Sequence, residues 1–350
     1  MPGLIAFGVA LLASLTLTMP VRALALRFGM VDLPGPRKVH TAPVPLLGGL
    51  AIYGGVVIAV LAVFQGAARA QVGGILAGAT LIIAVGILDD HGWLHHQVKL
   101  FVGMPLAGAI LLASGIHAQV FSVALDGRAG RVLDTLLTVF WVVGITAAFS
   151  ILDHMDGLCA GVAAIASAFF AVLAYRNGQA LVSVLAAAVL GAAAGFLRWN
   201  FRPAKIFMGD GGAMLLGFLM ATLGLKLRLA PANHFAAWLA PVAVLGLPVF
   251  DTALVWISRM RRGLIPFATP GKDHAAHRLV SLGLSQRDAV LTLYAAAVLA
   301  GGLGVLETYL LERPAVLLAV LASALAVCAI ALLERAPYHR QPAGDSPRDS

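Results

Sequence analysis

Acidic and histidine side chains gather at five points of this chain, although its composition leaves few of them. Only 16 of the 350 residues are Asp or Glu, and 60% are hydrophobic. The five polar islands are Arg37-Lys38-Val39-His40, Asp89-Asp90, Asp153-His154-Met155-Asp156-Gly157, Gly209-Asp210-Gly211-Gly212, and Asp273-His274 with His277. Paired carboxylates suit a divalent cation or a proton transfer, and basic groups suit phosphates. We therefore expect one active site assembled from loops.

Asp89 and Asp90 end the third long apolar run, and the loop after them contains Lys99. An acidic pair can simply mark the end of a helix. However, carboxylates at a helix C-terminus oppose the helix dipole, which costs stability. The pair is therefore expected to hold a cation or to move a proton.

Asp153 and Asp156 stand three residues apart, so on a helical backbone they share one face. Mg²⁺ or a basic group of a ligand would relieve their mutual repulsion. Alternatively, Asp156 is only the N-cap of the next helix, but this leaves Asp153 and His154 without a role. We favour a functional pair in which Asp156 serves both purposes.

Asp210 lies among glycines at the start of another apolar run. It would serve well as a helix N-cap. A glycine-flanked helix start also binds anions, and an Asp there can hold the metal ion that bridges a pyrophosphate. Upstream, Asn200 and Lys205 belong to a polar, basic stretch that suits a nucleotide or a phosphate, so the two interpretations are compatible.

His274 and His277 stand in a long loop that also carries Arg261 and Arg278. The spacing of the histidines suggests zinc, but the basic residues around them would lower the affinity for a metal ion. A patch attracted to anionic lipid would explain the arginines and not the histidines. A diphosphate is the expected ligand.

The elements that must position these islands are apolar helices. Mean hydropathy is +0.93, and 11% of the residues are charged, against roughly 25% in soluble domains. A helix of about 20 apolar residues crosses a bilayer. By this criterion the sequence contains about eleven transmembrane helices, with ten as the alternative count. The runs are residues 3–26, 46–65, 70–88, 101–118, 135–152, 158–175, 179–197, 211–227, 235–257, 289–306 and 314–333. The predicted fold is an all-α polytopic membrane bundle.

The basic residues predict the orientation of this bundle. Of the Lys and Arg residues, 16 fall in one set of alternating loops and 7 in the other. The positive-inside rule places the richer set in the cytoplasm, with the N-terminus outside and the C-terminus inside. The cytoplasmic loops, which contain every island, are residues 27–45, 89–100, 150–157, 198–210 and 258–288. We expect one catalytic domain over residues 1–335 and a disordered tail over 336–350.

Taken together, the islands resemble the polyprenyl-phosphate N-acetylhexosamine-1-phosphate transferases. The resembling stretches occur in family order and are Arg37-Lys38-Val39-His40 through Pro43-Val44-Pro45 to Gly48-Gly49; Asp89-Asp90 through Lys99; Phe149 to Gly157; Asn200 through Pro203-Ala204-Lys205 to Asp210-Gly211-Gly212; and Asp273-His274 through His277-Arg278-Leu279. Any one of them is a weak signal, and the ordered set is a strong one.

The resemblance implies that a polyprenyl phosphate, such as undecaprenyl phosphate, attacks the diphosphate of a UDP-linked amino sugar. UMP leaves, and the lipid-linked sugar initiates a cell-envelope glycan. By motif position, the resemblance implies Asp210 as the ligand of Mg²⁺, with Mn²⁺ as an alternative. It places Asp89 and Asp90 near the lipid phosphate. The other implied site residues are Asp153, Asp156, His274 and His277 for catalysis, and Lys38, His40, Lys99, Ser150, Asn200, Lys205, Arg261 and Arg278 for substrate binding.

The implied location is the bacterial cytoplasmic membrane, with the active site on its cytoplasmic face. The implied partners are the UDP-sugar, the polyprenyl phosphate and the bilayer, with a homodimer as an option and no nucleic acid. The chain departs from the family pattern at four positions: Ala147 and Ser150 replace asparagines, Ala276 a histidine and Leu46 an arginine. These departures indicate a divergent member.

Two other classes of protein share some of these features. A transporter of nucleotide sugars would place ionisable residues near the middle of the bilayer, where only Asp251 and Arg22 are candidates. An aspartyl intramembrane protease would need a glycine where Phe207 precedes Gly209-Asp210. Both classes fit less well than the transferase.

Overall fold

Helices form almost all of the regular structure in this computed structural model, which describes residues 1–33, 42–64, 68–94, 96–125, 127–229, 234–266 and 271–336. The first half contains α1 (Pro2–Arg27), α2 (Gly48–Val63), α3 (Arg69–Asp90), α4 (His96–Val98), the π-helix η1 (Lys99–Gly103), α5 (Met104–Ala113), α6 (Phe121–Ala124) and α7 (Arg128–Leu152). The second half contains α8 (Leu158–Arg176), α9 (Ala180–Asn200), α10 (Gly209–Lys226), α11 (His234–Val244), α12 (Gly246–Arg261), α13 (Ala275–Ser281), α14 (Gln286–Glu307) and α15 (Glu312–Leu333). Two short strands, β1 (Val31–Asp32) and β2 (Val44–Pro45), pair antiparallel. The prediction of an all-α fold is confirmed.

Seven helices of the described chain are long and apolar enough to cross a membrane, namely α1, α3, α7, α8, α9, α14 and α15. The bent pair of α11 and α12 makes an eighth if it counts as one span, and α2 and the segment Lys99–Ala113 are shorter apolar helices. The prediction of an apolar helical bundle is confirmed at this level. The count of eleven spans stays a prediction, because the runs at 46–65 and 101–118 hold helices shorter than a span needs.

The run at 235–257, expected as one helix, is broken in the structure. Its two parts meet at an angle of 74° between Val244 and Gly246. Pro248 follows in the first turn of α12, and because proline has no N–H, it cannot bond to the carbonyl of Val244. The helix therefore changes direction at this point. Hydropathy records how apolar a run is and not its direction, so the sequence did not reveal the bend.

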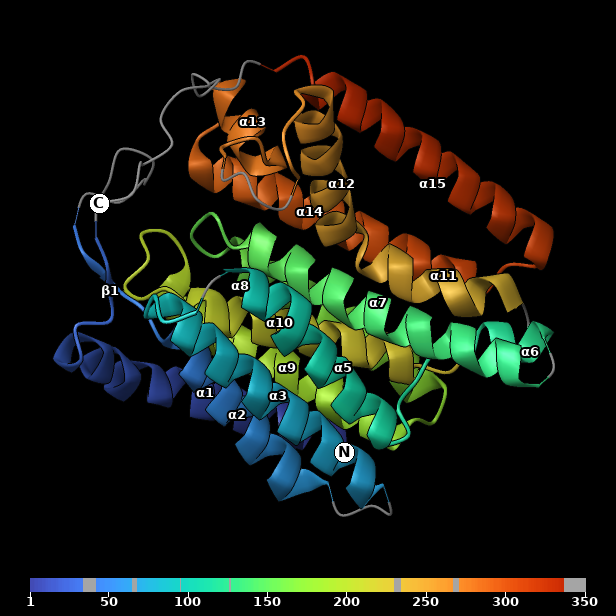
Figure 1. The fold of residues 1–350 in the computed structure, drawn as a ribbon, viewed down its shortest axis with the longest axis horizontal. Helices are drawn as coiled ribbons and strands as arrows, with labels where there is room; N and C mark the ends of the chain where they lie inside the picture. Colours follow the sequence, from blue (N-terminus) through green and yellow to red (C-terminus); the bar gives the residue numbers. More distant parts are fainter. Residues whose placement is uncertain are drawn as a thin grey trace.

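α10 is the central helix of the bundle (Figure 1). It packs against α2, α3, α7, α8 and α9, and its side chains from Gly211 to Leu223 are buried. A helix that is apolar all round belongs in a protein interior. Its first turn is less enclosed, since the side chain of Asp210 is 31% exposed.

Glycine pairs bring α10 close to two neighbouring helices. A Cβ atom at Gly86 of α3 would overlap the backbone of Gly211, and one at Gly49 of α2 would overlap the backbone of Gly212. Small residues allow helices to approach closely in lipid, where no hydrophobic force drives them together. The Gly86–Gly211 contact therefore sets Asp89 and Asp90, at the end of α3, beside the start of α10.

Replacement of Gly86 by Ala is expected to destabilise the protein by about 1–3 kcal/mol, the usual cost of overpacking a tight contact. Gly73 on the same helix has open space around it, so Gly73→Ala serves as the matched control and should leave stability unchanged or raised. Melting temperatures of the two variants in detergent would check this. Equal effects of the two substitutions would contradict the close contact.

α11, α14 and α15 lie along one side of the bundle (Figure 1). α14 packs against α8 and α11, whereas α15 contacts α11, α13 and α14. None of the most apolar part of α15 is buried within the protein, so this helix presents its surface to lipid. α12 packs against α7 and α14, and it leads to the loop and short helix α13 that carry the histidines.

Candidate active site

Asp90 caps the start of α10 from a different helix. Its carboxylate accepts hydrogen bonds from the backbone N–H groups of Asp210 at 2.9 Å and Gly211 at 3.3 Å. The first N–H groups of a helix have no partner within the helix, so a carboxylate there satisfies them and complements the dipole. Gly209 is required at this point, because its φ is +72° and a Cβ would collide with Asp90. The capping role expected for Asp210 thus belongs to Asp90.

Lys99 connects the acids of two helices. Its Nζ lies 2.6 Å from Asp89 Oδ2 and 2.7 Å from Asp210 Oδ2. Ser150, at the end of α7, donates a hydrogen bond from its Oγ to Asp210 Oδ1 at 2.9 Å. The structure therefore brings together five residues that the sequence assigned to one site: Asp89, Asp90, Lys99, Ser150 and Asp210. With Asp153 they form what we call the acidic cluster.

Asp153 shows how crowded the negative charge is in the acidic cluster. Burial raises the pKa of Asp153 to about 8, and the charges of Asp210, Asp90 and Asp156 contribute to the rise. Lys99 is the one cation described within the cluster, against four carboxylates. Oxygen ligands with excess negative charge are what Mg²⁺ binds in proteins. The residues present therefore fit a divalent cation.

The raised pKa of Asp153 predicts a pH-dependent stability. Between its ordinary pKa of 3.8 and the folded value of about 8, the folded state binds more protons than the unfolded state, so stability falls as pH rises through this window. Without divalent metal, the melting temperature in detergent should therefore fall from about pH 5 to about pH 8. Mg²⁺ should oppose the fall, and Asp153→Asn should weaken it. An unchanged slope in the Asn variant would contradict this assignment.

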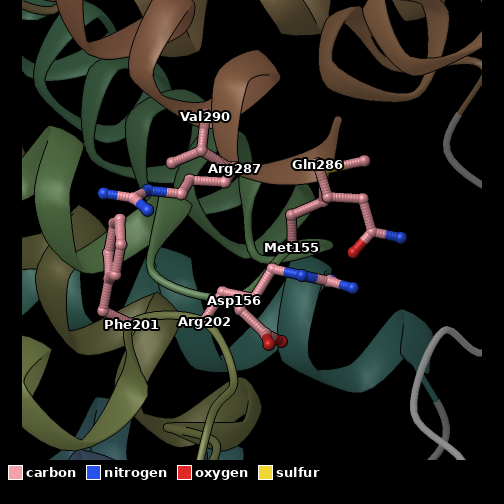
Figure 2. A pocket seen from close by; sticks show the side chains of 7 residues that line it. All are labelled: Met155, Asp156, Phe201, Arg202, Gln286, Arg287 and Val290. Carbon is pink, nitrogen blue, oxygen red and sulfur yellow. The ribbon is translucent and has the colours of Figure 1, made fainter. Parts of the chain in front are cut away.

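Asp156, three residues after Asp153, lines a separate small pocket (Figure 2). The pocket is lined by Met155, Asp156, Phe201, Arg202, Gln286, Arg287 and Val290. One carboxylate oxygen of Asp156 accepts a hydrogen bond from the backbone N–H of Ala204 at 3.1 Å. The exposed guanidinium groups of Arg202 and Arg287 give this surface a positive character that suits a phosphate or nucleotide.

Asn200 was predicted to bind substrate. It is buried, and both ends of its side-chain amide form hydrogen bonds within the protein. Its Oδ1 accepts a hydrogen bond from the N–H of Gly157 at 3.1 Å, and its Nδ2 donates to the carbonyl of Ile206 at 3.0 Å. It thereby ties the loop after α7 to the loop after α9. In this structure Asn200 positions the two loops.

A second group, which we call the histidine cluster, consists of His154, Asp251, His274 and His277. The ring of His154 is stacked on that of His274, with 4.2 Å between the centroids, and lies 5.0 Å from the ring of His277. Asp251 of α12 lies 2.8 Å from His274 Nδ1 and accepts a hydrogen bond from the N–H of Ala275. Because Asp153 and His154 are adjacent, the two clusters meet at one peptide bond.

Burial lowers the pKa of His277 to about 4, and the nearby charges of His274 and Lys272 act in the same direction. His277 is therefore neutral at physiological pH. It is half-buried at the edge of the histidine cluster. A neutral imidazole there can donate or accept a hydrogen bond with a ligand.

Arg278 was expected to bind substrate, but the structure places it in the interior. Its side chain is fully buried and forms an ion pair with Glu334 at 2.7 Å. It also donates hydrogen bonds to Ser258 Oγ and to the carbonyls of Asp273 and Leu333. Arg278 therefore joins α13 to α12 and α15 instead of facing a ligand.

The neighbouring Asp273 is also structural. Burial alone would raise its pKa, but Arg259 and Arg262 hold it at about 2. Arg259 makes a two-point contact with the carboxylate, at 3.0 and 2.9 Å. Such a buried, bidentate pair fixes the loop between α12 and α13.

Three further predicted site residues have separate positions. Arg261 is 68% exposed and lies 3.3 Å from Glu334. Lys205 is exposed, with its Nζ 5.4 Å from the ring centroid of Trp199. Lys38 and His40 lie outside the described residues.

Sequence reasoning missed several residues of these clusters. His154 was left without a role, and Asp251 was noted only as a charge within an apolar run. Arg287 was not singled out, and nothing in its local sequence marks it. The signal that could have found Asp251 is its position, since ionisable residues deep in apolar helices have partners.

Comparisons with known proteins give a consistent result. Residues 72–228 match the family model "Glycosyl transferase family 4". The chain is 39% identical over 294 residues to the probable undecaprenyl-phosphate N-acetylglucosaminyl 1-phosphate transferase of Bacillus subtilis (strain 168), covering 83% of this chain and 80% of that protein. It is 36% identical over 303 residues to the decaprenyl-phosphate N-acetylglucosaminephosphotransferase of Mycolicibacterium smegmatis, and the match covers 78% of this chain and 74% of that protein. It is 27% identical over 308 residues to the undecaprenyl-phosphate alpha-N-acetylglucosaminyl 1-phosphate transferase of Escherichia coli (strain K12), and the match covers 82% of this chain and 79% of that protein.

Proposed function

Because this chain belongs to glycosyl transferase family 4, we propose that it transfers N-acetylglucosamine 1-phosphate from its UDP-sugar to a polyprenyl phosphate. UMP is the other product. The relatives named above act on undecaprenyl or decaprenyl phosphate and N-acetylglucosamine, and none supports the transporter alternative. The observation that carries the proposal is the acidic cluster at the open end of α10.

The acidic cluster supplies what a phosphoryl transfer needs, which is positioning and charge compensation. Mg²⁺ held by Asp210, with Asp89 or Asp153 beside it, would neutralise the donor diphosphate. Lys99 adds a fixed positive charge between the helices. Asp90 is committed to the N–H groups of α10, so Asp89 is the better candidate to take the last proton of the lipid phosphate.

The pocket of Figure 2 supports a place for the nucleotide. Asp156 offers a carboxylate that accepts N–H donors, and Arg202 and Arg287 offer guanidinium groups for phosphate oxygens. Asp153 and Asp156 lie on the same loop, so a donor bound here would reach the acidic cluster with its diphosphate. The half-exposed His277 would meet the sugar or the diphosphate from the other side.

The test of this function uses purified protein in detergent with undecaprenyl phosphate, Mg²⁺ and a panel of UDP-sugars. We expect UMP release that requires both the lipid and UDP-N-acetylglucosamine. Replacing Mg²⁺ by Mn²⁺ should keep part of the activity, and EDTA should remove it. No UMP release with any UDP-sugar, or equal release without lipid, would contradict the proposal.

We also propose that both clusters face the bacterial cytoplasm, with the N-terminus outside, the C-terminus inside and one catalytic domain over residues 1–335. The excess of basic residues in the loops that carry the clusters supports this orientation. A membrane-impermeant maleimide should label Trp93→Cys and Ser285→Cys only in inverted vesicles, and Arg128→Cys only in intact cells. Cys328 is exposed, so it is first replaced by Ser. Labelling of positions 93 and 285 from opposite faces would contradict a shared site.

A further inference from the structure

His154 has surroundings that a loop residue rarely has. It stands between Asp153 and Asp156, and its ring is stacked on His274 with an interplanar angle of 24°. Its Nδ1 lies 3.1 Å from the carbonyl of Ile151, within its own segment. Its Nε2 is buried and has no hydrogen-bond partner among the described residues. The contacts that connect this ring to the rest of the site are therefore the stack on His274 and the tilted contact with the ring of His277.

The partner ring of His274 is held firmly in place. Its Nδ1 lies 2.8 Å from Asp251 Oδ2, and the other oxygen of Asp251 accepts the N–H of Ala275 at 2.7 Å. The side chains of His274 and Asp251 are only 7% and 2% exposed. A carboxylate on one ring nitrogen fixes both the tautomer and the orientation of an imidazole. His274 is thus a rigid surface for His154.

A metal site is the first alternative, because single ligand atoms of His154, Asp251 and His274 all lie within 4.8 Å of one another. Imidazoles that share a zinc ion point their ring-plane lone pairs at a common position about 2.0–2.1 Å away. Stacked rings lie in nearly parallel planes instead, so a shared ion would lie well outside both planes. The observed arrangement is that of a packed pair.

We propose that His154 is a positioning residue of the transferase, an inference that rests on the proposed function. Its ring, stacked on His274, sets the loop that carries Asp153 and Asp156 at a fixed distance from His277. The ring acts by its flat shape and not by its nitrogens.

Loss of the ring should act on turnover more than on substrate binding. A displacement of about 1 Å in a catalytic group can cost about 100-fold in rate. His154→Ala removes the ring and is expected to lower kcat by about this factor with little change in KM. His154→Phe keeps a flat ring of similar size without nitrogens, and it should retain most of the activity. His117→Ala is the matched control. The carbonyl of His117 bonds to Arg228, which follows the end of α10 opposite to Asp210, so this variant should keep the wild-type activity.

Three results would overturn the proposal. Normal kcat in His154→Ala would show that the stack positions nothing. Equal losses in the Ala and Phe variants would assign the role to the ring nitrogens. Zinc that copurifies with the wild-type protein in equimolar amount, and is absent from both variants, would establish a metal site.

A second measurement separates this inference from the proposed function. Hydrogen–deuterium exchange of the segments around residues 152–158 and 273–278 should be faster in His154→Ala and unchanged in His154→Phe. This result would support the positioning role even if the wild-type protein released no UMP. If the wild type is active and exchange is the same in all three proteins, the positioning role is contradicted while the transferase stands.

Discussion

Asp210→Asn is expected to lower the rate of UMP release by a factor on the order of 1000. Removal of one preorganised contact that stabilises a transition-state charge has an effect of this size. The Asn side chain can still accept the hydrogen bond from Ser150, and the cap of α10 is unchanged because Asp90 provides it. The variant loses the negative charge beside Lys99 and any strong bond to Mg²⁺. Activity is measured with undecaprenyl phosphate and UDP-N-acetylglucosamine, and raised Mg²⁺ should recover part of the loss.

The matched control is Asp288→Asn. Asp288 also stands in the first turn of a helix, where its N–H and carboxylate both bond to Ser285 Oγ. It lies outside the acidic cluster and is exposed, so the Asn variant should keep near wild-type turnover. Near-normal activity of Asp210→Asn, with unchanged dependence on Mg²⁺, would move the metal to the other carboxylates of the cluster.

Lys99→Met is the second substitution with a large expected effect, on the order of a 100-fold to 1000-fold loss of turnover. Lys99 keeps the carboxylates of Asp89 and Asp210 together at 2.6 and 2.7 Å. Without it, the two acids repel each other and a fixed cation is lost beside the phosphates. Arg should not replace it well, because a planar guanidinium cannot occupy the place of a compact ammonium that is only 17% exposed.

Lys226→Met is the control for Lys99. Lys226 ends α10 at the opposite side of the bundle, where its Nζ donates to Gln71 Oε1 at 2.8 Å. Its loss removes a half-buried lysine from the same set of helices without touching either cluster, so turnover should stay near the wild-type value. If both variants lost activity equally, the effect would be one of folding and not of the site. Melting temperatures of both proteins would decide this.

The sequence predicted the four carboxylates of the acidic cluster because scarce charges stood at the ends of apolar runs, whereas Ser150 was assigned through the family resemblance alone. It could not predict how they meet. The approach of Asp90 to Asp210 depends on the contact between Gly86 and Gly211. The sequence shows a glycine in an apolar run, but it does not show which helix that glycine packs against. The capping of α10 by Asp90 was missed for the same reason.

Two other results show what periodicity and composition leave undetermined. Arg278 stands in a basic loop beside two histidines, so its charge suggested a ligand, yet it is buried against Glu334. A charge in sequence does not state whether its partner is a substrate or another part of the protein. Likewise His154 stood in a polar island, but its partner could not be predicted, because stacking on His274 requires two loops that only the fold brings together.

The burial of Arg278 has a practical consequence for handling the protein. α15 has little packing along its length, but its last residues, Leu333 and Glu334, bond to Arg278 in the helix that follows His274. A truncation that removes Leu333 and Glu334 would therefore take two partners from the buried Arg278 and would disturb the segment that carries the histidines, which is far away in the sequence.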